Sequence, residues 1–123
     1  MKRVLAVGNC GFDQRALQML LAREFQAETS GADSATEALR AAQTGQYDLI
    51  LINRLLDADG SEGMAILRDL KQDNATRHLP VMLITNFADQ QALAIAAGAE
   101  LGFGKKTLHE PTTKNLLAKY LAT

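Results

Sequence analysis

The sequence predicts an α/β domain in which a parallel β-sheet is covered by helices on both faces. Continuous apolar runs occur at 4–7, 49–52 and 81–84, and each is too short to be a helix. Such runs are typical of strands that are buried on both sides. Segments with apolar residues at helical spacing separate them, and this alternation favours a parallel sheet with right-handed crossovers. The 123 residues suffice for one domain, which we predict over 1–123.

The first strand, 4–7, ends at a turn over 8–11 whose two glycines permit a tight connection. A helix is predicted next, because apolar residues recur at helical spacing at Ala16, Leu17, Leu20, Leu21 and Phe25. A weaker extended segment at 27–30 predicts the second strand. Ser34 and Glu37 then form a capping-box pattern, which indicates the start of a second helix.

The strand predicted at 47–53 is the centre of the sheet. Four consecutive large aliphatic residues precede Asn53, and a loop containing Asp57 and Asp59 follows it. In a parallel sheet the carboxyl end of such a strand faces the ligand crevice. Asn53 is therefore the residue expected at the functional edge of the sheet.

The second half of the chain repeats the alternation. We predict a helix over 64–70, a strong strand over 80–85 and a short helix over 93–97. The segment 101–104 is a poor strand by propensity, because two glycines weaken it. Pro111 suits the first position of a last helix.

Strand strength predicts the order of the sheet. The strong strands near Leu5, Leu51 and Leu83 should be central, and the weak ones near Thr29 and Phe103 should be edges. The flavodoxin-like order 2-1-3-4-5 satisfies both conditions. We therefore predict a (βα)5 three-layer sandwich with a five-stranded parallel sheet.

Composition excludes several classes of function. Thirteen basic residues balance 14 acidic ones and are scattered, so no nucleic-acid surface is predicted. The apolar runs are far too short to span a membrane, and the N-terminus has no signal-peptide pattern. The single cysteine, Cys10, forms no internal disulfide, which fits a reducing cytoplasm.

Four segments and Lys105, in this order, resemble the receiver domains of bacterial two-component response regulators. Residues 2–7 look like the first strand of that family, and 48–53 look like the strand that carries its phosphoacceptor. The segment 79–85 looks like the fourth strand, which ends in the switch Thr. Residues 97–100, followed by Lys105, look like the approach to the invariant Lys. The resemblance covers the whole chain.

The resemblance implies which residues form the site. In the family, two acidic residues and an acceptor Asp hold a divalent cation, and a Thr and a Lys bind the phosphoryl oxygens. The acidic pair falls on Gly8 and Asn9, and the acceptor falls on Asn53; Thr85 and Lys105 match the family. The aromatic switch position falls on Gly102, with Phe103 beside it on the opposite face, and Lys106 replaces the family's Pro.

These departures predict a loss of the family's chemistry. An Asn amide is not a carboxylate nucleophile, so Asn53 is not expected to form an acyl phosphate. Magnesium prefers anionic oxygen ligands, and no carboxylate remains at the mapped positions. A divalent cation about 4 Å from the Lys105 ammonium would be repelled by roughly 8 kcal/mol at an effective dielectric of about 20. We therefore predict no magnesium and no other cofactor, and an anion is favoured over a cation.

The resemblance then implies a degenerate receiver, a pseudo-receiver, that binds other proteins without being phosphorylated and is not an enzyme. Its partner would be a histidine kinase, an output domain or another signalling protein, or a second copy in a homodimer. By resemblance, the partner surface spans the fourth helix, fifth strand and fifth helix. We expect it to include Phe103, Lys106 and Leu108. Neither nucleic acid nor membrane is an expected partner.

Several alternatives remain open. Asn53 could be an amide that caps the following loop. Asp57 or Asp59 could be a displaced phosphoacceptor or a weak cation site, although a D-x-D-G loop also suits a simple turn. Cys10 could be redox active, since a helix N-terminus can lower the pKa of a thiol. A flavodoxin-like enzyme or nucleotide binder is the least favoured, because the chain has no phosphate-loop motif.

Overall fold

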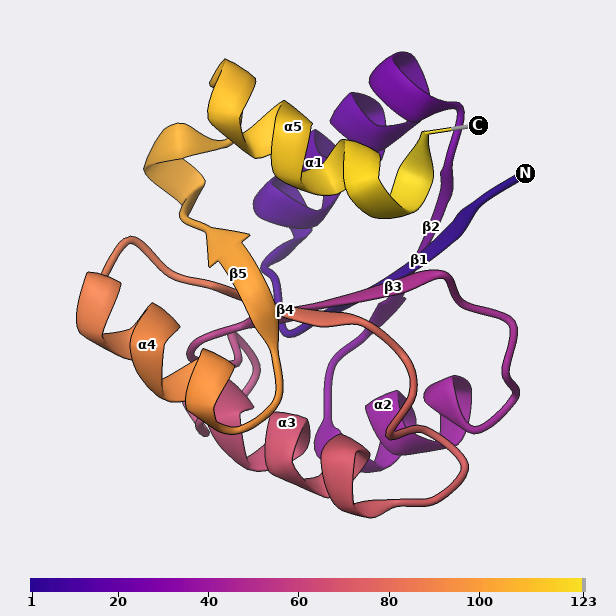
Figure 1. The fold of residues 1–123 in the computed structure, drawn as a ribbon, viewed down its shortest axis with the longest axis vertical. Coiled ribbons are helices and arrows are strands. Elements are labelled where there is room, and N and C mark those ends of the chain that lie inside the picture. The colour runs from indigo at the N-terminus through magenta and orange to yellow at the C-terminus, as the bar shows by residue number, and fades with distance from the viewer. Residues whose placement is uncertain (123) are drawn as a thin grey trace.

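Five parallel strands form one sheet in the order β2-β1-β3-β4-β5 in the computed structural model, which describes residues 1–122 (Figure 1). The strands are β1 (Arg3–Val7), β2 (Glu28–Ala32), β3 (Leu49–Asn53), β4 (Val81–Ile84) and β5 (Glu100–Phe103). The helices are α1 (Gly11–Phe25), α2 (Ala35–Ala42), α3 (Gly63–Gln72), α4 (Ala88–Ala96), the 3₁₀ helix η1 (Lys105–Thr107) and α5 (Pro111–Leu121). The predicted fold and strand order are confirmed.

Helices cover both faces of the sheet, with α1 and α5 on one face and α2, α3 and α4 on the other (Figure 1). Two apolar clusters fill the spaces between these layers. Leu5, Ile50 and Leu83 lie in the cluster that also contains α3 residues, whereas Leu51 and Met82 lie in the cluster that contains Leu117 of α5. Alternation along each strand therefore divides its side chains between two cores, as expected for a strand buried on both faces. No helix among residues 1–122 is long and apolar enough to cross a membrane.

Local capping explains where the first two helices begin. In α1, the Cys10 sulfur accepts a hydrogen bond from the Asp13 N–H at 3.4 Å, so the helix starts at Gly11, before the apolar pattern from Ala16. In α2, the Ser34 hydroxyl accepts from the Glu37 N–H at 3.2 Å. The Glu37 carboxylate accepts from the Asp33 N–H, one residue before the cap, and so completes a shifted capping box.

The edge formed by β4, β5 and α4 departs from the predicted pattern. Met82 pairs with Glu100 and Ile84 pairs with Phe103, so β5 has one more residue than β4 between these pairs. This irregularity is a β-bulge. The helix α4 exists, but two residues of its predicted apolar stripe, Leu93 and Ile95, are about half exposed, at 52% and 47%. Gln91 and Ala94 are the buried residues of α4.

Candidate functional site

The carboxyl ends of the central strands meet at one edge of the sheet, and the structure brings three predicted site residues together there. A cavity of about 180 Å³ is lined by Asn53, Thr85 and Lys105. The rest of its lining comes from Arg54, Leu55, Ile84, Asn86 and Phe87. Gly8 lies next to Asn53, but Gly8 and Asn9 do not line the cavity.

Gly8 is held in a position that only glycine suits. Its φ angle is +81°, and a Cβ built on it would lie 2.7 Å from Cγ of Leu56. The residue is buried, and its N–H donates to the Ala32 carbonyl at 2.8 Å. An aspartate at this position would therefore meet both backbone strain and a steric clash.

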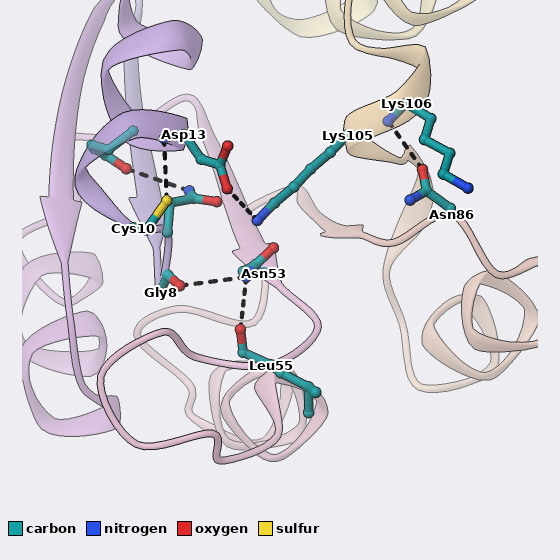
Figure 2. A network of polar contacts seen from close by, with 10 residues as sticks. Gly8, Cys10, Asp13, Asn53, Leu55, Asn86, Lys105 and Lys106 are labelled. Carbon is teal, nitrogen blue, oxygen red and sulfur yellow. Dashed lines mark hydrogen bonds and ion pairs between the residues drawn. The ribbon is translucent and has the colours of Figure 1, made fainter.

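Asn53 uses its amide nitrogen to join the tip of β3 to two neighbouring carbonyls (Figure 2). Its Nδ2 donates to the Leu55 carbonyl at 2.6 Å and to the Gly8 carbonyl at 3.4 Å. The Asn53 amide therefore caps the following loop, which is one of the alternatives that the sequence left open. A carboxylate has no proton to donate to these oxygens, so the contacts require the amide.

The loop between β3 and α3 closes over the strand tips without placing its acids in the cavity. The Asp57 N–H donates to the Gly8 carbonyl at 2.9 Å, and the Asp57 side chain is exposed. The Asp59 carboxylate accepts from the hydroxyl and the N–H of Ser61, at 2.6 Å and 2.9 Å, which lowers the pKa of Asp59. Both acids are outside the cavity lining, so the structure does not unite them with Thr85 and Lys105.

Lys105 has a partner that the sequence analysis missed. Its ammonium lies 2.6 Å from the carboxylate of Asp13 on α1. Figure 2 shows the two side chains pointing toward one another. This hydrogen bond, supported by charge attraction and a hydrogen bond from the Cys10 thiol, lowers the pKa of Asp13. The expectation of an unopposed positive charge on Lys105 is therefore wrong, because Asp13 largely neutralises it.

Thr85 and its neighbours are also bonded locally. The Thr85 hydroxyl accepts a hydrogen bond from the Phe87 N–H at 3.2 Å. Thr85 itself is only 8% exposed. The Asn86 side chain accepts from the Lys106 N–H at 3.1 Å, which ties the end of β4 to the segment after β5. Arg54 stacks on Phe87, with 5.2 Å between the guanidinium carbon and the ring centroid. These contacts leave a small, largely preformed polar cavity.

The donor set at this edge does not suit a magnesium ion. Gly8, Asn9 and Asn53 supply no carboxylate, and the nearest acid in the network, Asp13, is paired with Lys105. Residues 1–122 contain no group of three or more His, Cys, Asp or Glu side chains that could hold a metal ion.

The predicted partner surface needs one correction. Phe103 is only 5% exposed and packs with Leu51, Met82 and Leu117 in the core between the sheet and α5. Its inclusion in an exposed surface was wrong, because β-strand alternation directs it inward. Lys106 is exposed and Leu108 is partly buried.

A second cavity of about 250 Å³ lies between the start of α1 and the segment after β5. It is mostly apolar, and the Asp13–Lys105 pair forms part of its wall. Phe12, which is 80% exposed, is on its lining. The sequence signal for Asp13 and Phe12 was weak, since both precede the apolar stripe of α1.

The family model described as "Response regulator receiver domain" matches residues 5–118. The response regulator PleD of Caulobacter vibrioides is 35% identical over 83 residues, which are 68% of this chain but only 18% of PleD. The chemotaxis protein CheY-3 of Vibrio cholerae is 27% identical over 118 residues, covering 95% of this chain and 89% of CheY-3.

Solved structures agree on the fold. A response regulator receiver domain from Clostridium thermocellum superposes with a TM-score of 0.76 at 24% identity, covering 98% of this chain and 91% of the other. The family match spans most of the chain, and the strand order and layers observed above are those of the structural neighbours. This chain therefore belongs to the response regulator receiver domain family of two-component signalling.

Proposed function

We propose that this receiver domain acts as a protein-interaction module that does not depend on aspartyl phosphorylation. One observation carries the proposal: the tip of β3 presents the Asn53 amide, which donates to the carbonyls of Gly8 and Leu55. The phosphorylation chemistry implied by the family requires a nucleophilic carboxylate at this place. An amide whose nitrogen is occupied in two backbone contacts is neither an anion nor free to move.

The loss of a cation site supports the same proposal. Phosphoryl transfer depends on electrostatic stabilisation of the transferring group, for which a divalent cation is the usual source. The strand tips offer amides and a backbone carbonyl, and the only nearby carboxylate of the network is paired with Lys105. We therefore propose that the domain binds no magnesium and catalyses no phosphoryl transfer.

The proposed partner is a protein, such as a histidine kinase, an output domain or another signalling protein. Exposed apolar side chains on α4 and β5 support a partner at this part of the molecule. Leu93, Ile95 and Leu101 are all about half exposed, and Lys106 is exposed nearby in sequence. A mixture of apolar and charged side chains is typical of non-obligate interfaces.

Incubation with acetyl phosphate and magnesium, followed by intact-mass measurement, tests the proposal. We expect no mass increase under conditions that phosphorylate a receiver with an intact acceptor Asp, which serves as the positive control. A stable phosphoryl adduct would contradict the proposal. If peptide mapping placed the adduct on Asp57, and Asp57→Ala abolished it, the domain would instead be a phosphorelay receiver with a displaced acceptor.

A further inference from the structure

Gln91 is a buried polar residue of α4. This helix packs against β4 and β5 (Figure 1). Gln91 is only 8% exposed, and its side-chain amide is fully engaged with the two strands. Nε2 donates to the carbonyls of Leu83 and Thr85, at 2.9 Å and 3.3 Å. Oε1 accepts from the Gly102 N–H at 2.9 Å. We refer to these three contacts as the Gln91 bridge.

The Gln91 bridge lies where the pairing of β4 with β5 is irregular. Between Met82 and Ile84 the register of β4 and β5 shifts, because β5 contains an extra residue. A bulge of this kind disrupts the ladder locally and leaves backbone groups without their ordinary partners. A side-chain amide offers the same donor and acceptor as a peptide group. Gln91 thus links the Leu83 carbonyl to the Gly102 N–H through its side-chain amide.

The bridge is possible because residue 102 is glycine. A Cβ built on Gly102 would lie 2.3 Å from the Leu83 carbonyl oxygen and 3.3 Å from the Gln91 amide. A side chain at residue 102 and the bridge therefore exclude one another unless β5 moves. By resemblance, residue 102 is the position that carries the aromatic switch residue in the family. The Gln91 amide therefore lies where the family has a side chain that is expected to move.

We infer that the Gln91 bridge holds α4, the end of β4 and β5 as one rigid unit. Opening the unit breaks three hydrogen bonds at buried positions and takes the Gly102 N–H away from its side-chain acceptor, which is unfavourable. Thr85 and the half-exposed Leu93 and Leu101 consequently keep one arrangement. Gln91 is a positioning residue for this surface, which a partner meets preformed. Only this last consequence rests on the proposed function.

Amide hydrogen exchange and NMR relaxation dispersion of the uniformly labelled domain test the inference. In the wild-type domain we expect no microsecond-to-millisecond exchange over residues 83–104. In Gln91→Met, which preserves the length of the side chain and removes all three bonds, the Gly102 amide should exchange at least about tenfold faster, and dispersion should appear over 83–104. Gln90→Met, the same change at the neighbouring and partly exposed residue of α4, is the matched control and should match the wild type.

Two further variants separate this effect from a general loss of stability. Ile66→Val removes a methylene from the core under α3, so it lowers protection across the sheet without dispersion confined to 83–104. Gln91→Glu, studied at neutral pH, keeps an acceptor for Gly102 but has no donor for Leu83 and Thr85. The carboxylate would also face the Leu83 and Thr85 carbonyl oxygens at a buried position, so the Gly102 amide should exchange at least as fast as it does in Gln91→Met.

The inference is overturned if the wild-type domain already shows dispersion over 83–104. It is also overturned if Gly102 exchange in Gln91→Met rises only in proportion to that of the β1 and β3 amides. The wild-type measurement decides the matter even where Gln91→Met fails to fold. Neither measurement involves a partner or a phosphoryl donor, so this inference and the proposed function can fail separately.

Discussion

The nitrogen of the Asn53 side chain determines much of what the strand tips can do. It donates to the carbonyls of Gly8 and Leu55, and both bonds disappear if the nitrogen becomes an oxygen. A carboxylate there would also face two carbonyl oxygens and gain repulsion in place of attraction. By resemblance, Asn53 stands where the family has its nucleophile, and in this structure its side chain is a hydrogen-bond donor.

We predict that Asn53→Asp lowers the free energy of unfolding by about 1–2 kcal/mol at neutral pH, because two donor contacts are lost at a half-buried position. It should not create magnesium binding, since Gly8 and Asn9 remain. Urea denaturation with and without magnesium measures both effects. The matched control is Asn9→Asp, because Asn9 Nδ2 donates only one long bond, at 3.3 Å to Gln14. Greater stability of Asn53→Asp in magnesium would contradict the prediction.

A second prediction concerns the ion pair between Asp13 and Lys105. Because Lys105 lowers the pKa of Asp13, the pair stabilises the fold above the unfolded-state pKa of an aspartate, about 4, and this stability is lost as the pH falls through the lower folded-state pKa. Asp13→Asn should therefore cost about 0.5 kcal/mol at neutral pH, as for other partly exposed pairs. The difference from wild type should vanish in acid. Denaturant titrations over a pH series, with the exposed Asp57→Asn as control, check both the size and the direction.

The sequence placed Asn53, Thr85 and Lys105 at one site, and the structure brings them together at the lining of a single cavity. The partner of Lys105 could not be predicted in the same way. Asp13 lies 92 positions away, and nothing in the composition of α1 identifies which acid reaches the β5 tip. Long-range side-chain pairing depends on the docked geometry of helices, which periodicity does not determine.

At the scale of elements, the three central strands were predicted because each run is apolar on both faces, and the two weak edge strands followed from the alternation with helices. The orientation of α4 was not, because its buried face contains a glutamine while two aliphatic residues face outward. Helical periodicity assigns apolar residues to the core, and that rule fails where an irregular sheet edge leaves backbone groups to satisfy. The bulge in β5 and the orientation of α4 are thus connected, because α4 turns Gln91 toward the backbone groups at the bulge.

The end of α3 offers a test of a buried cap. Thr76 is fully buried, and its hydroxyl donates to the Leu70 carbonyl in the last turn of the helix at 2.7 Å. Thr76→Val keeps the shape but leaves this carbonyl unpaired, so we predict a loss of about 1–3 kcal/mol in the free energy of unfolding. Thr36→Val, at an exposed position of α2, is the matched control. Equal effects of the two changes in chemical denaturation would disprove the capping role.

For the molecule as a whole, the proposed loss of the cation site predicts that magnesium does not stabilise the fold. A ligand that binds only the native state raises its stability by RT ln(1 + [L]/Kd), which is about 2.7 kcal/mol at a hundredfold excess over Kd. We expect the unfolding temperature to stay unchanged as magnesium replaces an equal ionic strength of sodium. A rise that saturates with magnesium would reveal a site.

The domain covers 89% of CheY-3 but only 18% of PleD, so relatives of this chain occur both as nearly whole proteins and as parts of much longer ones. The proposed mode of action suits either setting, since a surface with one arrangement needs no signal from within the domain.

The close contact between Gly8 and Leu56 has an evolutionary consequence. A single mutation that restored an acid at residue 8 would place a side chain against Leu56 and strain a backbone already at positive φ. The β3–α3 loop would have to be rebuilt in the same step, and Asn53 would have to change as well. A single substitution at residue 8 is therefore not enough to give these strand tips an acid, because it would have to come with changes at Leu56 and in the loop.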